Sequence, residues 1–189
     1  MSTEIFDSLS DSERSGLIVL PAAIFILIAG ADGNVDDKEV ATFNRLLSSV
    51  DDSDQDLTSI CVRRLRASSS GLVATLATMM EQGSSESSAR LAAQIAWQKF
   101  PNQVVTDYFE DLLELAKQIA AASGGLFGGS ISKEEKQALA AIRKLLFIDA
   151  RVAAQTPQHG PQATESQPTY DYDSVKERFA VRVYADEHP

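Results

Sequence analysis

Acidic side chains suited to binding a hard cation gather where a long apolar run of the chain ends. Asp32, Asp36 and Glu39 all lie in the stretch Ala31-Asp-Gly-Asn-Val-Asp-Asp-Lys-Glu39. Carboxylate oxygens are the ligands that calcium and magnesium prefer in proteins, and a turn beside a helix start can bring several of them together. The spacing predicts a site for a divalent cation, calcium or another, in this stretch.

This stretch is not a calcium loop of the EF-hand type. Ile28 and Gly30 stand at its first and third positions, where side-chain oxygens are required. The acidic run 51–56 fails differently, because Leu57 replaces the required glycine and Arg63 the final glutamate. Only a looser cation site, built around one turn, fits the pattern.

The same residues also have a purely structural interpretation. Asp36-Asp-Lys-Glu39 and Ser132-Lys-Glu-Glu135 are both capping boxes, in which the first side chain and the glutamate satisfy backbone N–H groups at a helix start. Acidic residues in a first turn are also favoured by the helix dipole. Capping alone explains both glutamates, so the two interpretations stay open at this point.

The two boxes belong to an apparent internal duplication. When Val35 is aligned with Ile131, Glu39 falls opposite Glu135. The apolar positions that follow the two glutamates then also fall opposite one another. Apolar residues recur at helical spacing along most of the chain, and no strand-like alternation occurs before residue 150. The sequence therefore predicts an all-α fold, a single bundle of about seven helices built from two duplicated helical hairpin units, with a flexible C-terminal tail.

Helix boundaries follow from prolines, glycines and caps. We expect residues 1–10 to be loose, a short helix over 11–20 and a second helix starting at Pro21, whose fixed φ suits a first helical position. Gly33 should end that second helix in the left-handed conformation. Further helices are expected over 36–50, in a segment that starts at Leu57, and in a separate segment that ends at Gly83. Three more are expected from Ser85 to Phe100, from Asn102 to the glycine-rich stretch 123–130, and from Ser132 onward.

Composition changes near the end of the chain. We expect a helical domain over 1–150, a disordered linker over 151–172 that is polar and contains three prolines, and a short segment 173–189 that is a candidate docking peptide. Ser174-Val-Lys-Glu177 begins that segment with a capping-box pattern. Phe127, in the glycine-rich stretch, is expected to anchor local packing.

Charge and composition narrow the classes of partner and location. The net charge is -10, and residues 1–60 hold twelve acids against three bases, which argues against nucleic acid as a partner. The apolar run 17–31 is shorter than the ~20 residues of a membrane span, so a buried central helix is expected. One cysteine indicates a reducing compartment, and we expect a cytoplasmic protein. Arg63, Arg64 and Arg66 are candidates to bind an acidic partner, which includes the acidic first third of the same molecule, and the alternative is an ordinary solvated helix face.

The residue types needed for catalysis are scarce. Both histidines, His159 and His188, lie in the expected tail, and Cys61 falls on the apolar face of its helix, where it is expected to be a core residue. The stretch Gly124-Gly-Leu-Phe-Gly-Gly129 lacks the Lys-Ser/Thr ending of a phosphate loop. We expect a protein that is not an enzyme.

The apolar helix, the motif Ala31-Asp-Gly-Asn-Val-Asp-Asp-Lys-Glu39 and the following amphipathic helix resemble the TerB-like domain of tellurite-resistance proteins, also found in membrane-anchored DnaJ-like co-chaperones. The resemblance covers residues 17–149. It implies an all-helical bundle with an acidic cation-binding surface, acting with other proteins in stress-associated complexes near the inner face of the membrane. Asp32, Asp36 and Glu39 would carry the acidic cluster, with Glu135 as the matching acid of the second unit. The alternative is a metal-independent interaction scaffold with a docking C-terminal tail.

Overall fold

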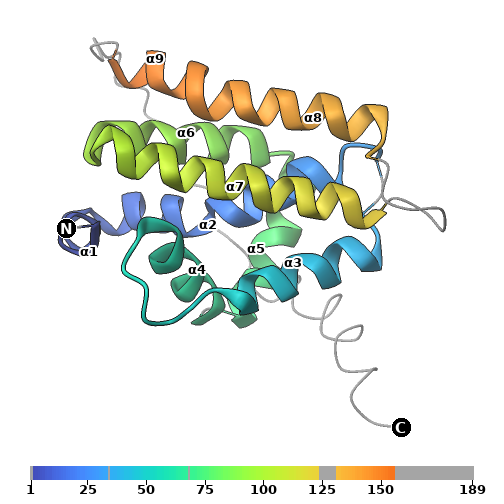
Figure 1. The fold of residues 1–189 in the computed structure, drawn as a ribbon, viewed down its shortest axis with the longest axis horizontal. Coiled ribbons are helices and arrows are strands. Elements are labelled where there is room, and N and C mark those ends of the chain that lie inside the picture. The colour runs from blue at the N-terminus through green and yellow to red at the C-terminus, as the bar shows by residue number, and fades with distance from the viewer. Residues whose placement is uncertain (1, 34, 68, 124–130, 156–189) are drawn as a thin grey trace, which may run out of the picture.

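The chain folds into a bundle of helices, drawn in Figure 1 from a computed structural model that describes residues 2–33, 35–67, 69–123 and 131–155. The described residues contain helices and no strand, which confirms the predicted all-α class. The elements are α1 (Ser2–Ser8), α2 (Asp11–Ala29), α3 (Asp37–Ser49), α4 (Leu57–Ala67), α5 (Ser69–Gln82), α6 (Ser85–Lys99), α7 (Asn102–Ser123), α8 (Lys133–Lys144), the π-helical segment Leu145–Asp149 and α9 (Ala150–Gln155).

The central element is α2, which packs against α4, α5, α6, α7 and α8. Its residues from Leu20 to Ile26 are all buried. Within the described ranges it is the one helix long and apolar enough to cross a membrane, yet 56% of its most apolar window lies inside the bundle. The prediction of a buried central helix is confirmed.

Pro21 lies inside α2, so the predicted helix break between residues 20 and 21 was wrong. A proline in a helix interior cannot donate to the carbonyl four residues earlier, here that of Leu17. The hydroxyl of Tyr108, on α7, donates to that carbonyl oxygen at 3.0 Å and replaces the missing N–H. Both groups are buried, so without this contact the Leu17 carbonyl would have neither water nor a helical N–H as donor. The Tyr108 hydroxyl therefore lets the helix continue through Pro21.

The N-terminus is also more ordered than expected, because residues 2–8 form α1. Phe6 is fully buried, and the guanidinium of Arg64 on α4 lies 5.8 Å from the centre of its ring. Arg14 on α2 donates to the carbonyl of Asp7 at 2.9 Å. One aromatic anchor and two arginines thus fix a segment that is mostly polar.

The C-terminal helices form a single rod in which the segment Leu145–Asp149 has π-helical hydrogen bonding. Trp97 on α6 donates from Nε1 to the carbonyl oxygen of Leu146 at 2.8 Å. Phe109 packs edge-on against both Trp97 and Phe147, with ring centres 5.8 and 5.7 Å apart. These contacts attach the rod to α6 and α7.

Within the described residues the rod reaches Gln155, so residues 151–155 of the predicted linker are helical. The Arg151 guanidinium lies 4.9 Å from the Trp97 ring and Ala150 is buried, contacts that hold this last turn on the bundle. The rest of the predicted linker, the segment 173–189 and Phe127 lie outside the described residues.

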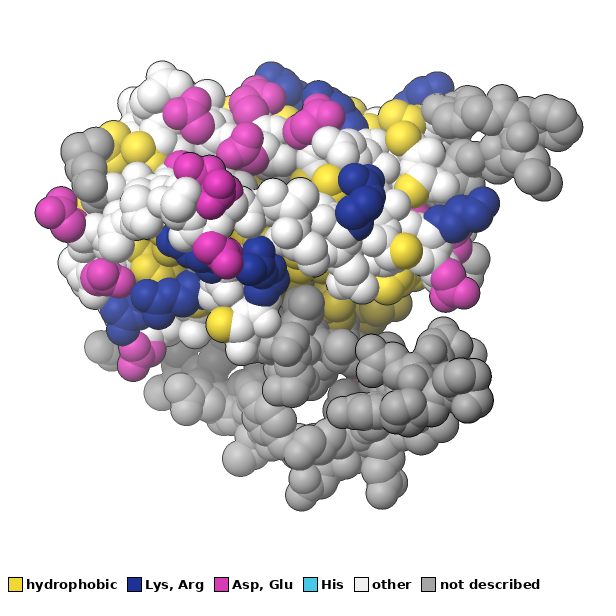
Figure 2. Space-filling model, turned by 60° about the horizontal axis from the view of Figure 1, so that its bottom comes forward, with side chains coloured by type: hydrophobic (Ala, Val, Ile, Leu, Met, Phe, Trp, Pro, Cys, Tyr) yellow, Lys and Arg dark blue, Asp and Glu magenta, His cyan; other side chains and the backbone are white. Residues whose placement is uncertain are grey.

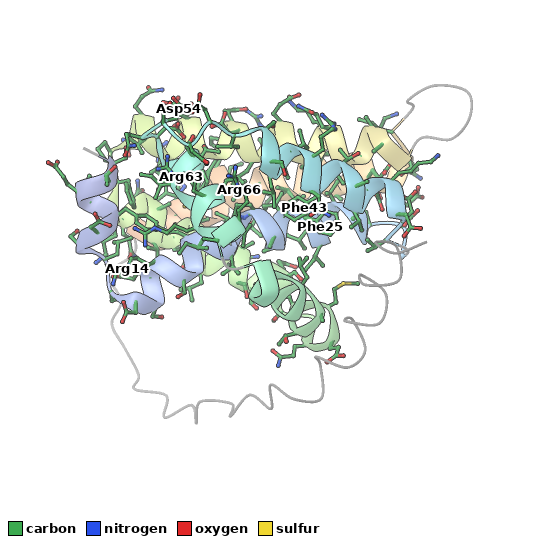
Figure 3. The ribbon with its side chains drawn as sticks, turned by 90° about the horizontal axis from the view of Figure 1, so that it is seen from below. Arg14, Phe25, Phe43, Asp54, Arg63 and Arg66 are labelled. Carbon is green, nitrogen blue, oxygen red and sulfur yellow. The ribbon has the colours of Figure 1, made fainter. Side chains whose placement is uncertain are left out.

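The two expected hairpin units correspond to α2 with α3 and to α7 with α8, and the contacts between them join α2 and α3 to α7 and α2 to α8. Both capping-box helices bury the glutamate of the box. Beyond the box their buried faces differ, since α3 buries Phe43 and Leu47 whereas α8 buries Ile142. Phe43 stacks on Phe25 of α2 with ring centres 4.5 Å apart, as Figure 3 shows. The two units thus match most closely at their caps.

Candidate functional site

Both predicted capping boxes are formed. At the start of α3, the Glu39 backbone N–H donates to Oδ1 of Asp36 at 2.8 Å, and the Asp36 backbone N–H donates to Oε2 of Glu39 at 2.9 Å. At the start of α8, the Glu135 N–H donates to Oγ of Ser132 at 3.0 Å, and the Ser132 N–H donates to Oε2 of Glu135 at 2.6 Å. The structural role expected for these residues is confirmed.

The two glutamates are the only charged side chains that are buried among the described residues. Glu39 is 3% exposed and Glu135 is 4% exposed. Burying a carboxylate disfavours its charged form, because the protein interior solvates charge less well than water. Capping requires only an acceptor, which a solvent-facing glutamate also supplies. The burial of both therefore goes beyond what a cap needs.

The Glu39 carboxyl has its pKa raised to about 7. Burial is the main cause, and the charges of Asp36, Asp32 and Glu135 add to it. The hydrogen bond from the Asp36 N–H lowers the pKa but does not offset these effects. Asp36, Asp32 and Glu135 are therefore each close enough to act on the Glu39 carboxyl.

A third capping box, at the start of α2, provides an internal comparison. Ser10 and Glu13 form the same reciprocal hydrogen bonds, although the sequence pattern at this position was missed. The Glu13 carboxylate lies 2.9 Å from Nζ of Lys99, and this partner, with the Ser10 hydrogen bonds, lowers the pKa of Glu13 to about 2. The same local motif thus gives opposite titration behaviour, because burial and neighbouring acids raise the pKa of Glu39 whereas Lys99 and the Ser10 hydrogen bonds lower that of Glu13.

Each predicted metal ligand has a defined place. Asp32 is exposed in the turn after α2, Asp36 is half-buried at the start of α3, and Glu39 and Glu135 are buried. Within the described residues, no three Asp, Glu, His or Cys side chains come together in a geometry that could hold a metal ion. The capping hydrogen bonds use Oε2 of each glutamate, and a carboxylate has a second oxygen that can serve as a ligand to a hard cation. A cation would thus require these side chains to move in order to gather as ligands.

Glycine shapes the turn that carries Asp32. Gly33 has φ of 87°, the left-handed conformation predicted for it, but α2 already ends at Ala29 with Gly30 as its cap, so Gly33 does not end the helix as expected. A Cβ atom at Gly30 would lie 2.8 Å from the carbonyl oxygen of Ile26, so a larger residue would displace the end of α2. Glycine is therefore favoured at both positions, Gly30 by the close carbonyl and Gly33 by its φ.

We expect Ser132→Ala to lower the free energy of unfolding by about 1 kcal/mol, because the Glu135 N–H loses its acceptor. Ser132→Asn should stay close to the wild type, since asparagine caps helices about as well as serine. Urea unfolding of both variants measures the difference. Equal losses in the two variants would show that the hydroxyl matters for something other than capping.

The acidic α3–α4 connection is held by arginines of α4, as the sequence suggested. Arg63 donates to the backbone carbonyls of Asp52 and Asp54, the latter at 2.8 Å, and Arg66 forms an ion pair with Asp52 at 3.0 Å. Figure 3 shows both arginines reaching toward the connection that carries Asp54. These residues give the acidic connection a fixed shape.

Cys61 lies in the core, as expected. It is fully buried next to Tyr108, and burial raises the pKa of its thiol to about 12. A thiol that stays protonated at neutral pH is a poor nucleophile. The residue belongs to packing rather than to chemistry.

Comparison of the chain with protein-family models, with curated proteins and with solved structures finds no match. The TerB-like resemblance accordingly rests on the motif around Asp32, Asp36 and Glu39. Independently of that resemblance, the geometry gathers acids from both halves of the duplication around one buried carboxyl.

Proposed function

We propose that this chain is a non-enzymatic, TerB-like helical module that binds a divalent cation at the acidic cluster and acts in complexes with other proteins. Asp32, Asp36, Glu39 and Glu135 are the proposed ligands. Calcium, magnesium or manganese suits this set, because all its donors are carboxylate oxygens. In this proposal the cation joins the two hairpin units where their caps meet.

The observation that carries the proposal is the burial of Glu39 among acids. A buried carboxyl whose charged neighbours are Asp36, Asp32 and Glu135 is disfavoured in its ionised form. A cation bound there would remove both the repulsion and the unfavourable burial of charge. The Glu13 box shows how a positive partner reverses this balance, because Lys99 lowers the pKa of Glu13.

The cellular setting follows from the resemblance alone. We place the module in the cytoplasm, peripheral to the inner face of the membrane, in stress-response complexes of the kind associated with tellurite resistance. The packing of α2 in the core supports a peripheral rather than a spanning association. Its proposed partners are proteins and not nucleic acid, in keeping with the net charge of -10.

The test is a titration of the full chain with calcium, magnesium, manganese and zinc, followed by calorimetry and by the melting temperature. One of the hard cations should raise the melting temperature, because a ligand that binds only the folded state stabilises it. Glu39→Gln and Glu135→Gln should each abolish the rise. Both substitutions keep the capping hydrogen bond, since glutamine also accepts from the cap N–H.

Glu134→Gln is the matched control, because Glu134 adjoins Glu135 in the sequence but is exposed. It should leave the cation response intact. If no cation changes the melting temperature of the wild type, or if Glu134→Gln removes the response as fully as Glu135→Gln, the proposed site is wrong.

A further inference from the structure

A groove with an apolar floor lies between α3, the α3–α4 connection, α4 and α7. It encloses about 480 Å³. Its floor contains the buried side chains of Leu47 and Val62 and the half-buried side chains of Leu46, Val50 and Leu115. A groove of this size offers several apolar side chains of a peptide a place out of water.

The rim of this groove carries charge of one sign. Among the residues that the structure describes, its lining has no Lys or Arg and includes five acids, namely Asp51, Asp54, Asp56, Asp111 and Glu114. Figure 2 shows acidic side chains gathered toward the upper left of one face of the molecule.

Three further charges modify that rim. The charge of Arg63 lowers the pKa of Asp51, and its guanidinium donates to the backbone carbonyl of Asp54. Lys117 lies 3.3 Å from Glu114, so three of the five rim acids have a basic neighbour. Burial raises the pKa of Asp111, with Asp56 and Asp107 adding to the effect. The rim therefore retains an excess of negative charge, and a peptide that is both apolar and basic would complement the groove.

We propose that the groove is the docking site of the chain's own segment 174–184. This segment contains every Lys and Arg that follows Arg151, namely Lys176, Arg178 and Arg182. It also contains Val175, Phe179, Val181, Val183 and Tyr184, against a single acid, Glu177. The basic side chains pair with the rim while the apolar side chains cover the floor, so the tail masks the groove and a partner with a similar segment must displace it.

The covalent connection allows this docking. Residues 156–173 join Gln155 to Ser174, and eighteen residues span up to about 60 Å when extended. The end of α9 and the α3–α4 connection lie toward the same end of the bundle, the left in Figure 1. A tether of this length gives the segment a high effective concentration at the groove, so even weak contacts are sufficient.

Paramagnetic relaxation measured by NMR on the full chain tests the proposal. A spin label on Ala185→Cys is selective, because Cys61 is fully buried. We expect strong loss of backbone amide signal at Val50, Thr58 and Leu115, and no such loss in α8. A mixture of labelled chains with isotope-enriched unlabelled chains should show no loss, because the contact is within one molecule.

Charge exchange makes the test specific. Reversing charges on the groove rim with Asp54→Lys and Glu114→Lys should remove the signal loss. Reversing the basic charges of the tail segment with Lys176→Glu, Arg178→Glu and Arg182→Glu should also remove it. Combining both sets should restore it, because opposite charges again face each other. Neither set touches the proposed cation ligands, so this result is independent of the proposed function.

The matched control is Glu81→Lys with Glu134→Lys, an equal change of net charge at two exposed acids outside the groove lining. It should leave the signal loss at the groove unchanged. Signal loss centred elsewhere, signal loss in the mixed sample, or failure of the combined charge exchange to restore the contact would each overturn the proposal.

Discussion

Replacing Tyr108 with phenylalanine should lower the free energy of unfolding by about 2 kcal/mol, because it leaves the buried carbonyl of Leu17 without a donor. The rings of the two side chains have nearly the same shape, so packing changes little. In an ordinary helix the N–H of residue 21 would donate to Leu17, but Pro21 has no N–H. The stability of the central helix thus depends on a hydroxyl from α7.

A double-mutant cycle isolates this contact. Pro21→Ala restores an N–H that donates to the Leu17 carbonyl. In that background Tyr108→Phe should lower the free energy of unfolding by at least about 1 kcal/mol less than in the wild type, a difference on the order of one hydrogen bond. Urea unfolding of the four proteins gives the coupling. Pro101→Ala is the control, because Pro101 is exposed ahead of α7 and should not couple to Tyr108. Equal costs in both backgrounds would mean that the hydroxyl does not serve the proline.

Glu39→Gln should make the protein more stable than the wild type at pH 8, by about 2 kcal/mol in the absence of divalent cations. The folded protein holds the Glu39 proton up to about pH 7, whereas the unfolded chain releases it near 4.5. Between these values the folded state binds more protons, so the stability of the wild type falls as the pH rises. Glutamine has no charge to bury and keeps the cap.

Urea unfolding at intervals from pH 5 to pH 8, with a chelator present, measures this slope. The difference between wild type and Glu39→Gln should grow across the range, and titration of other groups cancels in that difference. Glu13→Gln is the matched control, because its lowered pKa of about 2 leaves the window from pH 5 to pH 8 unaffected. A constant difference between wild type and Glu39→Gln would show that Glu39 is ionised throughout.

Local signals in the sequence were enough to predict the helical class and the caps of α3 and α8. Capping boxes and the left-handed Gly33 depend on a few neighbouring residues, so the pattern determines the geometry. The same reasoning named Glu39 and Glu135 as a pair through the duplication. It did not reveal that both are buried, because burial depends on how the two units pack.

The errors came from contacts between distant residues. A proline is a sound signal for a helix start unless another group takes over its missing hydrogen bond, and Tyr108 is 91 residues from Leu17. Residues 2–8 looked loose because no local pattern shows that Phe6 will be covered by α4. The groove went unnoticed for the same reason, since its acids come from the α3–α4 connection and from α7.

The π-helical segment Leu145–Asp149 bears on how distant homologues of this chain should be recognised. A π turn holds one residue more than the α turn it replaces. A homologue that lacks the widened turn should therefore align with a single-residue deletion between Lys144 and Ala150. An alignment that forbids gaps inside helices would shift every later position by one. The single-residue deletion in this segment is thus a signature by which such sequences can be sought.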